Sequence, residues 1–191
     1  MKVLFILGSP RSGGNTELLL KPVMQGVIDA GSGSELVRPA ELDIHPCLAC
    51  GGCTETGVCV VQDDMQQLYD KIDNADRIVV GSPIYFYGVT AQAKAFIDRC
   101  QALWSRKYLL GKRPAGNKTV RKGYFVGVAA TMGERVFEGA IMTVRYGLDA
   151  MDFSYAGELL VRGVDKKGEI ARFAEDLERA YRFGHDMVLD S

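Results

Sequence analysis

The chain has 191 residues, of which 47% are hydrophobic and 25% are charged, and its formal net charge is −1. This composition is typical of a globular protein, and the length predicts one domain over residues 1–191. The balanced charge gives no reason to expect nucleic acid or an anionic membrane as a partner. No apolar run approaches the roughly 20 residues of a membrane helix. The first apolar run is too short for an export signal, so five cysteines indicate a reducing compartment, and we expect a cytoplasmic protein.

Short apolar runs alternate with helical patterns from the first residues onward. The continuous apolar run Lys2–Leu7 predicts a central parallel strand that is buried on both faces. The elements expected next are a helix over Thr16–Ala30, a strand over Glu35–Arg38, a cysteine loop over about 40–62, a helix over Asp63–Asn74 and a strand over Arg77–Gly81.

The second half of the chain continues the same alternation. The expected elements are a helix over Val89–Ser105, a strand over Tyr124–Ala130, a helix over Glu134–Met151, a strand over Ser154–Val161 and a helix over Glu169–Met187. Strands that alternate with helices predict an α/β fold with a doubly wound parallel sheet of five strands. The cysteine loop is then an insertion in this single domain.

A basic stretch lies between two of these elements, over Ser105–Gly123, with seven basic residues and no acidic one. Its simplest interpretation is an exposed loop before a strand. The alternative is a binding surface for the phosphates of a phosphorylated nicotinamide nucleotide, which attract arginine and lysine.

The segment Gly8–Thr16, between the first strand and the first helix, is rich in hydroxyls and glycines. Ligands of open α/β sheets bind at the carboxyl ends of the strands, and a helix N-terminus favours an anion. The segment lacks the Gly-Lys-Ser/Thr of a Walker loop and the spacing of a dinucleotide fingerprint. We therefore predict a site for a phosphate monoester, such as that of FMN, with a simple helix cap at Ser12 or Asn15 as the alternative. The predicted phosphate ligands are Ser9, Arg11, Ser12, Asn15 and Thr16.

An aromatic segment follows the third expected strand. A planar isoalloxazine ring needs flat apolar neighbours, and this segment lies at the switch point where flavodoxin-like sheets hold FMN. The predicted ring contacts are Pro83, Ile84, Tyr85, Phe86 and Tyr87, although aromatic side chains in a subunit interface are an alternative.

The residues after the fourth expected strand give a weaker signal. Thr131, Met132 and Gly133 are expected to reach the pyrimidine edge of the ring, with an ordinary strand-to-helix turn as the alternative.

Four cysteines, Cys47, Cys50, Cys53 and Cys59, have the spacing C-x2-C-x2-C-x5-C. One short loop can thereby surround a single inorganic centre with four thiolates, and the bacterial ferredoxin run begins with the same two gaps. Zinc is one alternative, although a zinc site more often has two C-x2-C pairs held apart. Free or partly oxidised thiols are another. We predict these four cysteines as metal ligands, with an iron–sulfur cluster favoured, and Cys100 as a core residue.

The motifs together resemble the NADPH-dependent FMN reductase family, through Gly8–Thr16, Gly81–Gly88 and Ala91–Arg99. With the four cysteines added, the chain is similar to the iron–sulfur flavoproteins, a branch of that family, from Met1 to about Met187. The resemblance implies a flavodoxin-like fold with strand order 2-1-3-4-5, bound FMN and a [4Fe–4S] cluster. It also implies a homodimer or homotetramer in which a cluster lies close to a neighbour's flavin.

These features predict an FMN-dependent oxidoreductase in which flavin and cluster exchange electrons. The expected partners are a small molecule or a redox protein as electron donor or acceptor, with NAD(P)H or ferredoxin as the donor. No side chain is assigned as a general acid or base, because hydride transfer to flavin does not require one. The alternatives are a plain NAD(P)H-dependent FMN or quinone reductase without a cluster, and a non-catalytic flavodoxin-like electron carrier.

Overall fold

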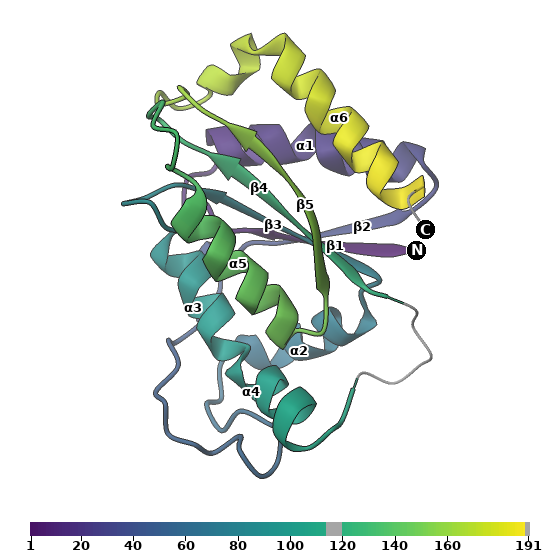
Figure 1. Ribbon diagram of the computed structural model, residues 1–191, viewed down its shortest axis with the longest axis vertical. Coiled ribbons are helices and arrows are strands. Elements are labelled where there is room, and N and C mark those ends of the chain that lie inside the picture. The colour runs from purple at the N-terminus through teal and green to yellow at the C-terminus, as the bar shows by residue number, and fades with distance from the viewer. Residues whose placement is uncertain (114–119, 190–191) are drawn as a thin grey trace.

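A single parallel sheet forms the centre of the molecule, and the computed structural model describes residues 1–113 and 120–189. The strands are β1 (Lys2–Leu7), β2 (Gly33–Val37), β3 (Arg77–Pro83), β4 (Lys122–Val128) and β5 (Ser154–Val161). They are all parallel, in the order β2-β1-β3-β4-β5 (Figure 1). The predicted α/β class and the strand order 2-1-3-4-5 are confirmed.

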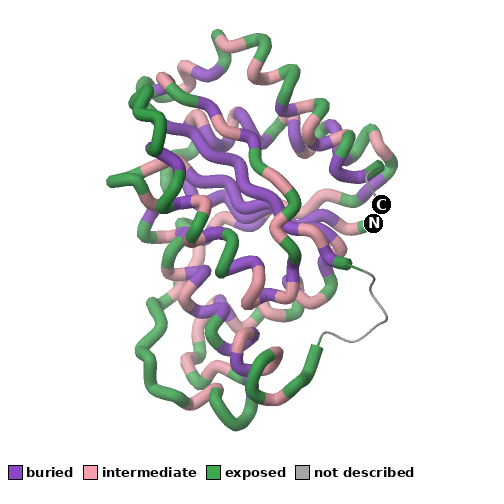
Figure 2. The backbone as a smooth tube through the Cα atoms, viewed as in Figure 1, coloured by how far each residue is buried: buried purple, intermediate pink, exposed green. Residues whose placement is uncertain are grey.

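Helices cover both faces of the sheet (Figure 1). One face packs against α1 (Asn15–Asp29) and α6 (Ala174–Leu189), and the other against α2 (Met65–Asn74), α3 (Ala91–Arg99) and α5 (Glu138–Ala150). Val3, Phe5 and Leu7 of β1 belong to the first core, whereas Leu4 and Ile6 belong to the second. The apolar run of β1 is therefore buried on both faces, as its sequence predicts, and Figure 2 shows the whole centre of the sheet as buried.

The helix predicted over Val89–Ser105 is the largest correction to the expected elements. It divides into α3, α4 (Gln101–Trp104) and η2 (Ser105–Leu109), a short π-helix. The break is at Cys100, whose amide donates to the carbonyl of Ile97, an i−3 bond that tightens the chain locally. This break turns α4 and η2 toward the cysteine loop.

The other elements differ from expectation mainly at their ends. The last helix is preceded by a separate 3-10 turn, η3 (Glu169–Arg172), and α5 begins at Glu138 rather than Glu134. A further 3-10 turn, η1 (Pro39–Glu41), follows β2. Within the described ranges, no helix is long and apolar enough to cross a membrane.

Helix α3 connects two distant parts of the molecule. The loops after β1, β3, β4 and β5 meet at the carboxyl edge of the sheet, where α3 begins. The cysteine loop hangs at the opposite end of α3, in the lower part of Figure 1, and is largely exposed (Figure 2). The fold thus separates two candidate sites by about the length of one short helix.

Candidate functional site: a phosphate cleft and a cysteine pocket

A cleft at the carboxyl edge of the sheet brings together residues from several predicted ligand segments. Its volume is about 100 Å³, which is small beside the roughly 300–1,000 Å³ of pockets that enclose a whole ligand. The cleft therefore suits one end of a ligand, such as a phosphate group. It is lined by Ser9, Arg11, Asn15, Thr16, Pro83, Ile84 and Tyr85 among the predicted residues, and by Val164, Asp165 and Lys167 of the loop after β5.

The N-terminus of α1 opens into this cleft. Gly14 is the residue before the helix, and no side chain caps it. The cap at Ser12 or Asn15, the alternative drawn from the sequence, is therefore wrong. Backbone amides of the first turn and the positive end of the helix dipole are left for an anion. Ser9 and Thr16 are buried beside them and Arg11 is exposed, so hydroxyls and one positive charge surround the helix end.

Asn15 connects two loops of the cleft. Its side-chain amide donates to the carbonyl of Lys166 at 2.9 Å, and its side-chain oxygen accepts from the amide of Ile170 at 3.3 Å. Both polar groups of Asn15 are thus engaged within the protein, and a contact with phosphate stays a prediction.

Glu17 holds the phosphate loop through its carboxylate, a role that the sequence did not indicate. Its carboxylate accepts the amide of Gly13 at 2.7 Å and pairs with the Arg38 guanidinium at 2.7 Å. The hydrogen bond from Arg38 is the main cause that holds the pKa of Glu17 below its usual value. Arg38 therefore neutralises a carboxylate that would otherwise repel an anion in the cleft.

Lys167 is a second residue that the sequence analysis missed. Its side chain lies over the phosphate loop, since its Cε would be 3.7 Å from a Cβ added to Gly13. The signal was present, because Lys167 follows β5, whose carboxyl end lies at the ligand-binding edge of a parallel sheet.

The aromatic segment forms a tight hairpin beside the cleft. Tyr85 and Gly88 exchange two backbone hydrogen bonds of 3.0 Å, and Phe86 and Tyr87 occupy the tip. The φ angles of Phe86 and Tyr87 are 50° and 63°, in the left-handed region that costs a non-glycine residue roughly 1–2 kcal/mol. Phe86 is fully exposed, at 104%. Strain held in place beneath exposed aromatic rings is typical of a binding site.

The loop after β4 lies between this hairpin and the loop after β5. A Cβ added to Gly133 would lie 3.6 Å from the hydroxyl of Tyr87. A Cβ added to Gly163 would lie 3.0 Å from the sulfur of Met132. These loops therefore form one continuous rim. The predicted residues on the rim or on its exposed surface, outside the lining of the cleft, are Ser12, Phe86, Tyr87, Thr131, Met132 and Gly133.

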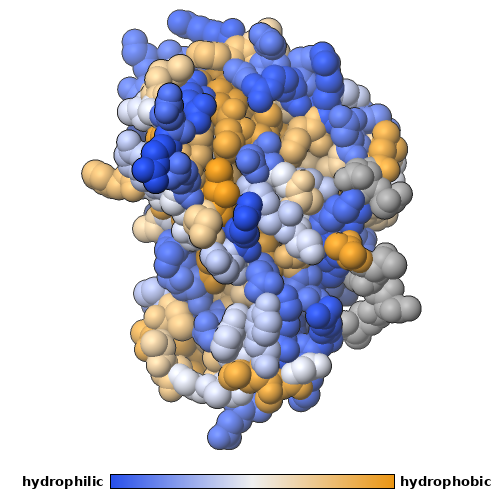
Figure 3. Space-filling model, viewed as in Figure 1, coloured by the Kyte–Doolittle hydropathy of each residue, from blue (hydrophilic) through white to orange (hydrophobic). Residues whose placement is uncertain are grey.

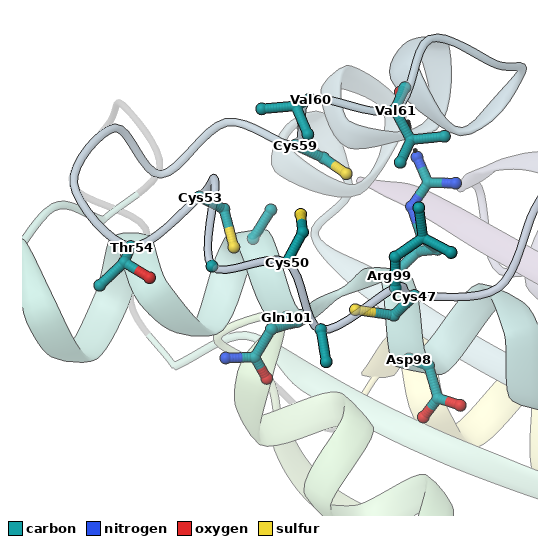
Figure 4. Close-up of a pocket in the computed structure, with 14 residues that line it drawn as sticks. Cys47, Cys50, Cys53, Thr54, Cys59, Val60, Val61, Asp98, Arg99 and Gln101 are labelled. Carbon is teal, nitrogen blue, oxygen red and sulfur yellow. Dashed lines mark hydrogen bonds between the residues drawn. The ribbon is translucent and has the colours of Figure 1, made fainter.

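The four clustered cysteines line a second pocket, of about 400 Å³, at the far end of α3. Cys47 and Cys50 are exposed, Cys53 and Cys59 are half-buried, and all four are free thiols. Figure 4 shows the sulfurs of Cys50 and Cys59 directed toward one another, with Cys53 beside them. One loop thus carries all four thiols to the wall of one cavity, as the spacing predicts.

The described thiols are not grouped around one point. A single zinc ion needs its thiolates at about 2.3 Å, and within residues 1–113 and 120–189 no three histidine, cysteine or acidic side chains are grouped closely enough for one ion. An iron–sulfur cluster and zinc both stay predictions for the four thiols that line this cavity.

Polar side chains from the helices lie against the cysteine loop. Ser105 is the first residue of the π-helix η2, and its hydroxyl is 3.6 Å from the sulfur of Cys53. The side chain of Gln66 donates to the carbonyls of Cys59 at 3.0 Å and Val61 at 2.6 Å. Such contacts order the loop, and either the hydroxyl or the thiol can donate in the contact between Ser105 and Cys53.

Several charges of the basic stretch are engaged within the protein. Arg106 pairs with Asp73, and Lys107 lies 3.0 Å from Asp149. Arg121 is buried and donates to backbone carbonyls. These three residues are engaged within the fold, whereas Lys112 and Arg113 are exposed. A nucleotide-phosphate role for the stretch stays a prediction, and its part over 114–119 lies outside the described residues.

Comparison with known proteins agrees with this geometry. Residues 1–151 match the NADPH-dependent FMN reductase family. An iron–sulfur flavoprotein of Archaeoglobus fulgidus is 34% identical over 188 residues, which cover 95% of this chain and 83% of that protein. Another, of Methanocaldococcus jannaschii, is 41% identical over 103 residues. That match covers 54% of this chain and 53% of the relative, so it spans about half of each.

The fold has close structural counterparts as well. An NAD(P)H:quinone oxidoreductase from Methanothermobacter marburgensis superimposes with a TM-score of 0.77 at 18% identity, over 98% of this chain and 96% of that one. At this identity the likeness concerns the fold. The chain belongs to the NADPH-dependent FMN reductase family, a family of flavin-dependent oxidoreductases, and within it to the branch of the iron–sulfur flavoproteins.

Proposed function

We propose that this protein is an FMN-dependent oxidoreductase that passes electrons between its flavin and a [4Fe–4S] cluster held by Cys47, Cys50, Cys53 and Cys59. The observation that carries the proposal is the presence, in one chain, of an anion cleft with an aromatic rim and a separate pocket lined by four thiols. Flavin accepts electrons in pairs and releases them singly, and a cluster carries one at a time.

The residues of the phosphate cleft hold the flavin in this account. Arg11, Ser9, Thr16 and the amides at the start of α1 bind the phosphate, and Lys167 adds a second positive charge. The aromatic hairpin and the loop after β4 flank the ring and leave one face open for a donor or acceptor. No described side chain has to move a proton, so orientation and charge are the protein's contribution.

The donor and the assembly follow from the family and the exposed surface. We infer NAD(P)H, or a reduced redox protein, as electron source, and a homodimer or homotetramer. The cysteine loop carries three exposed apolar side chains, Leu48, Val58 and Val60, and hydrophobic colour gathers at this lower end of the molecule in Figure 3. The free thiols favour a reducing, cytoplasmic setting, and a net charge of −1 gives no support to nucleic acid.

Iron and sulfide analysis of protein purified without oxygen tests the cluster. The wild-type protein and a Cys100→Ala control are expected to hold about four irons and four sulfides per chain, because Cys100 lies in the core. A Cys59→Ser variant is expected to lose most of both. Equal iron content in the Cys59 variant and the wild type would contradict the assignment.

Two alternative functions can be distinguished from this proposal by experiment. A plain NAD(P)H-dependent FMN or quinone reductase would bind FMN and turn over without iron. A non-catalytic electron carrier would contain the cofactors but show no steady-state oxidation of NADH or NADPH with a quinone as acceptor. The cysteine pocket favours the two-centre protein over both.

A further inference from the structure

Arg99 is the most deeply buried charged residue beside either site. Its side chain is 0% exposed, and it pairs with Asp63, which is also 0% exposed. Removing two charges from water is costly, and a pair of this kind is weak evidence for stability alone. The contacts of Arg99 give it a more specific role.

The guanidinium of Arg99 connects the two ends of the cysteine loop. It donates to the carbonyl of His45 at 2.9 Å on the side that leads into the loop, and to the carbonyl of Val61 at 3.3 Å on the side that leads out. Asp63 completes the closure by accepting the amide of His45 at 3.0 Å. One planar group with five donors is suited to such a task, and lysine is not.

A second observation directs Arg99 toward the contents of the pocket. Arg99 lines the cysteine pocket, and its Nε atom is buried without a hydrogen-bond partner among the described residues. A buried donor without a partner is costly, but the side chain is 0% exposed, so this atom does not open into the pocket. Figure 4 shows the guanidinium and the sulfur of Cys59 on the same side of the pocket. Arg99 therefore acts on the contents of the pocket through the loop that it holds and through its charge.

Helix α3 explains why this position carries the arginine. At its first turn, the Thr90 hydroxyl caps the helix and donates to the carbonyl of Gly8 in the phosphate loop. At its last residue, Arg99 holds the cysteine loop. Nine residues of helix span about 14 Å, at about 1.5 Å each. One rigid element therefore fixes both sites.

We propose that Arg99 is a positioning residue that shapes the cysteine loop for its cluster and places one permanent positive charge beside it. The inference rests on the proposed function, because it presumes a cluster in that pocket. Two effects follow, and they are separable. Closing the loop requires the forked geometry of arginine, whereas raising the reduction potential of the cluster requires only a positive charge, which favours the more negative reduced state.

Three variants separate the two effects. Arg99→Lys keeps the charge and loses the fork, and Arg99→Met loses both. Because Arg99→Met leaves Asp63 buried without a partner, the double change Arg99→Met with Asp63→Asn supplies a version without an uncompensated charge. Lys94→Met is the matched control for loop exchange, since Lys94 lies on the same helix but pairs with half-exposed Asp98 at 2.8 Å.

Hydrogen exchange in the protein stripped of iron reports on the loop directly. Amides of residues 46–62 are expected to exchange at least tenfold faster in all three Arg99 variants and unchanged in the Lys94 control. After reconstitution with ferrous iron and sulfide, the variants are expected to hold less than half of the wild-type iron. A potentiometric titration followed by electron paramagnetic resonance should place the cluster that remains at a more negative potential in the single Arg99→Met variant than in Arg99→Lys. FMN affinity, measured by fluorescence quenching, should be the same in all proteins.

The outcomes distinguish this inference from the proposed function. Wild-type protein that takes up no iron and sulfide would overturn the proposed function, and this inference with it. Wild-type protein that loads fully, beside a folded double variant with equal loading and equal loop exchange, would overturn this inference alone.

Discussion

Replacing Phe86 with glycine separates conformational strain from ligand binding at the tip of the aromatic hairpin. Phe86 has a φ of 50° and a fully exposed ring, so its removal costs no core packing. The left-handed conformation costs a non-glycine residue roughly 1–2 kcal/mol, and glycine recovers this cost. Glycine also adds conformational entropy to the unfolded chain, worth roughly 0.4–1 kcal/mol. The free energy of unfolding should therefore rise by about 0.5–1 kcal/mol.

The thermal midpoint of the FMN-free protein is the first readout. For a chain of this length a change of 1 kcal/mol shifts the midpoint by about 2–4 °C, so the Phe86→Gly variant should melt about 1–4 °C higher. FMN binding should change in the opposite direction. Loss of an aromatic contact worth about 0.5–1.5 kcal/mol weakens the affinity about two- to tenfold.

A Phe86→Ala variant is the matched control, because alanine removes the ring but keeps the strained φ. It should bind FMN as weakly as the glycine variant without any gain in stability. A glycine variant that melts below the wild type would refute the reasoning about strain. Unchanged FMN affinity in both variants would refute the placement of the ring against the flavin.

Three other changes test separate parts of the structure. A Cβ on Gly139 would lie 2.6 Å from a backbone oxygen of the hairpin, so Gly139→Ala should weaken FMN binding, measured by fluorescence, while Gly33→Ala should not. The pKa of Glu17 is lower in the folded protein than in the unfolded chain, so its contribution to stability is complete above the unfolded pKa of about 4.3 and is lost as pH falls through the folded pKa. The free energy of unfolding of a Glu17→Gln variant should therefore fall less steeply than that of the wild type below about pH 4.5, as measured by denaturant titration. Removing the hydroxyl with Ser105→Ala should shift the cluster to a more negative potential in an anaerobic titration, and an unchanged potential would count against the contact with Cys53.

Arg11→Ala tests the phosphate cleft with a large effect. An exposed arginine in charge-assisted contact with phosphate contributes about 1.5–3 kcal/mol, so FMN affinity should fall by roughly ten- to a hundredfold. Unchanged affinity would remove Arg11 from the phosphate site and favour Lys167 in its place.

The fold was predictable because its signals are local and repeated. The run Lys2–Leu7 has the length and continuous apolarity of a strand that is buried on both faces, and it is observed as such. The break of the expected Val89–Ser105 helix at Cys100 was not predictable, since no glycine or proline marks it. The turns that follow it contact the cysteine loop, as Ser105 does at Cys53, and a propensity-based prediction does not include such tertiary contacts.

The candidate site was predictable where chemistry is concentrated in one segment. The four cysteines are recognisable in the sequence by their spacing, and the hydroxyl-rich loop by its composition. Glu17, Lys167 and Arg99 do not, because each acts through partners that are distant in sequence. Asn15 lines the cleft as well, but the sequence did not indicate that its side chain joins two loops through partners that are distant in sequence.

The visible absorption spectrum of protein purified without oxygen tests the central claim most directly. The account predicts flavin bands above a broad shoulder that bleaches on reduction, because both centres absorb in this range. Flavin bands alone, in protein with intact thiols and after reconstitution with iron and sulfide, would contradict the two-centre account. The protein would then be a plain FMN reductase, and its cysteine loop would serve another purpose.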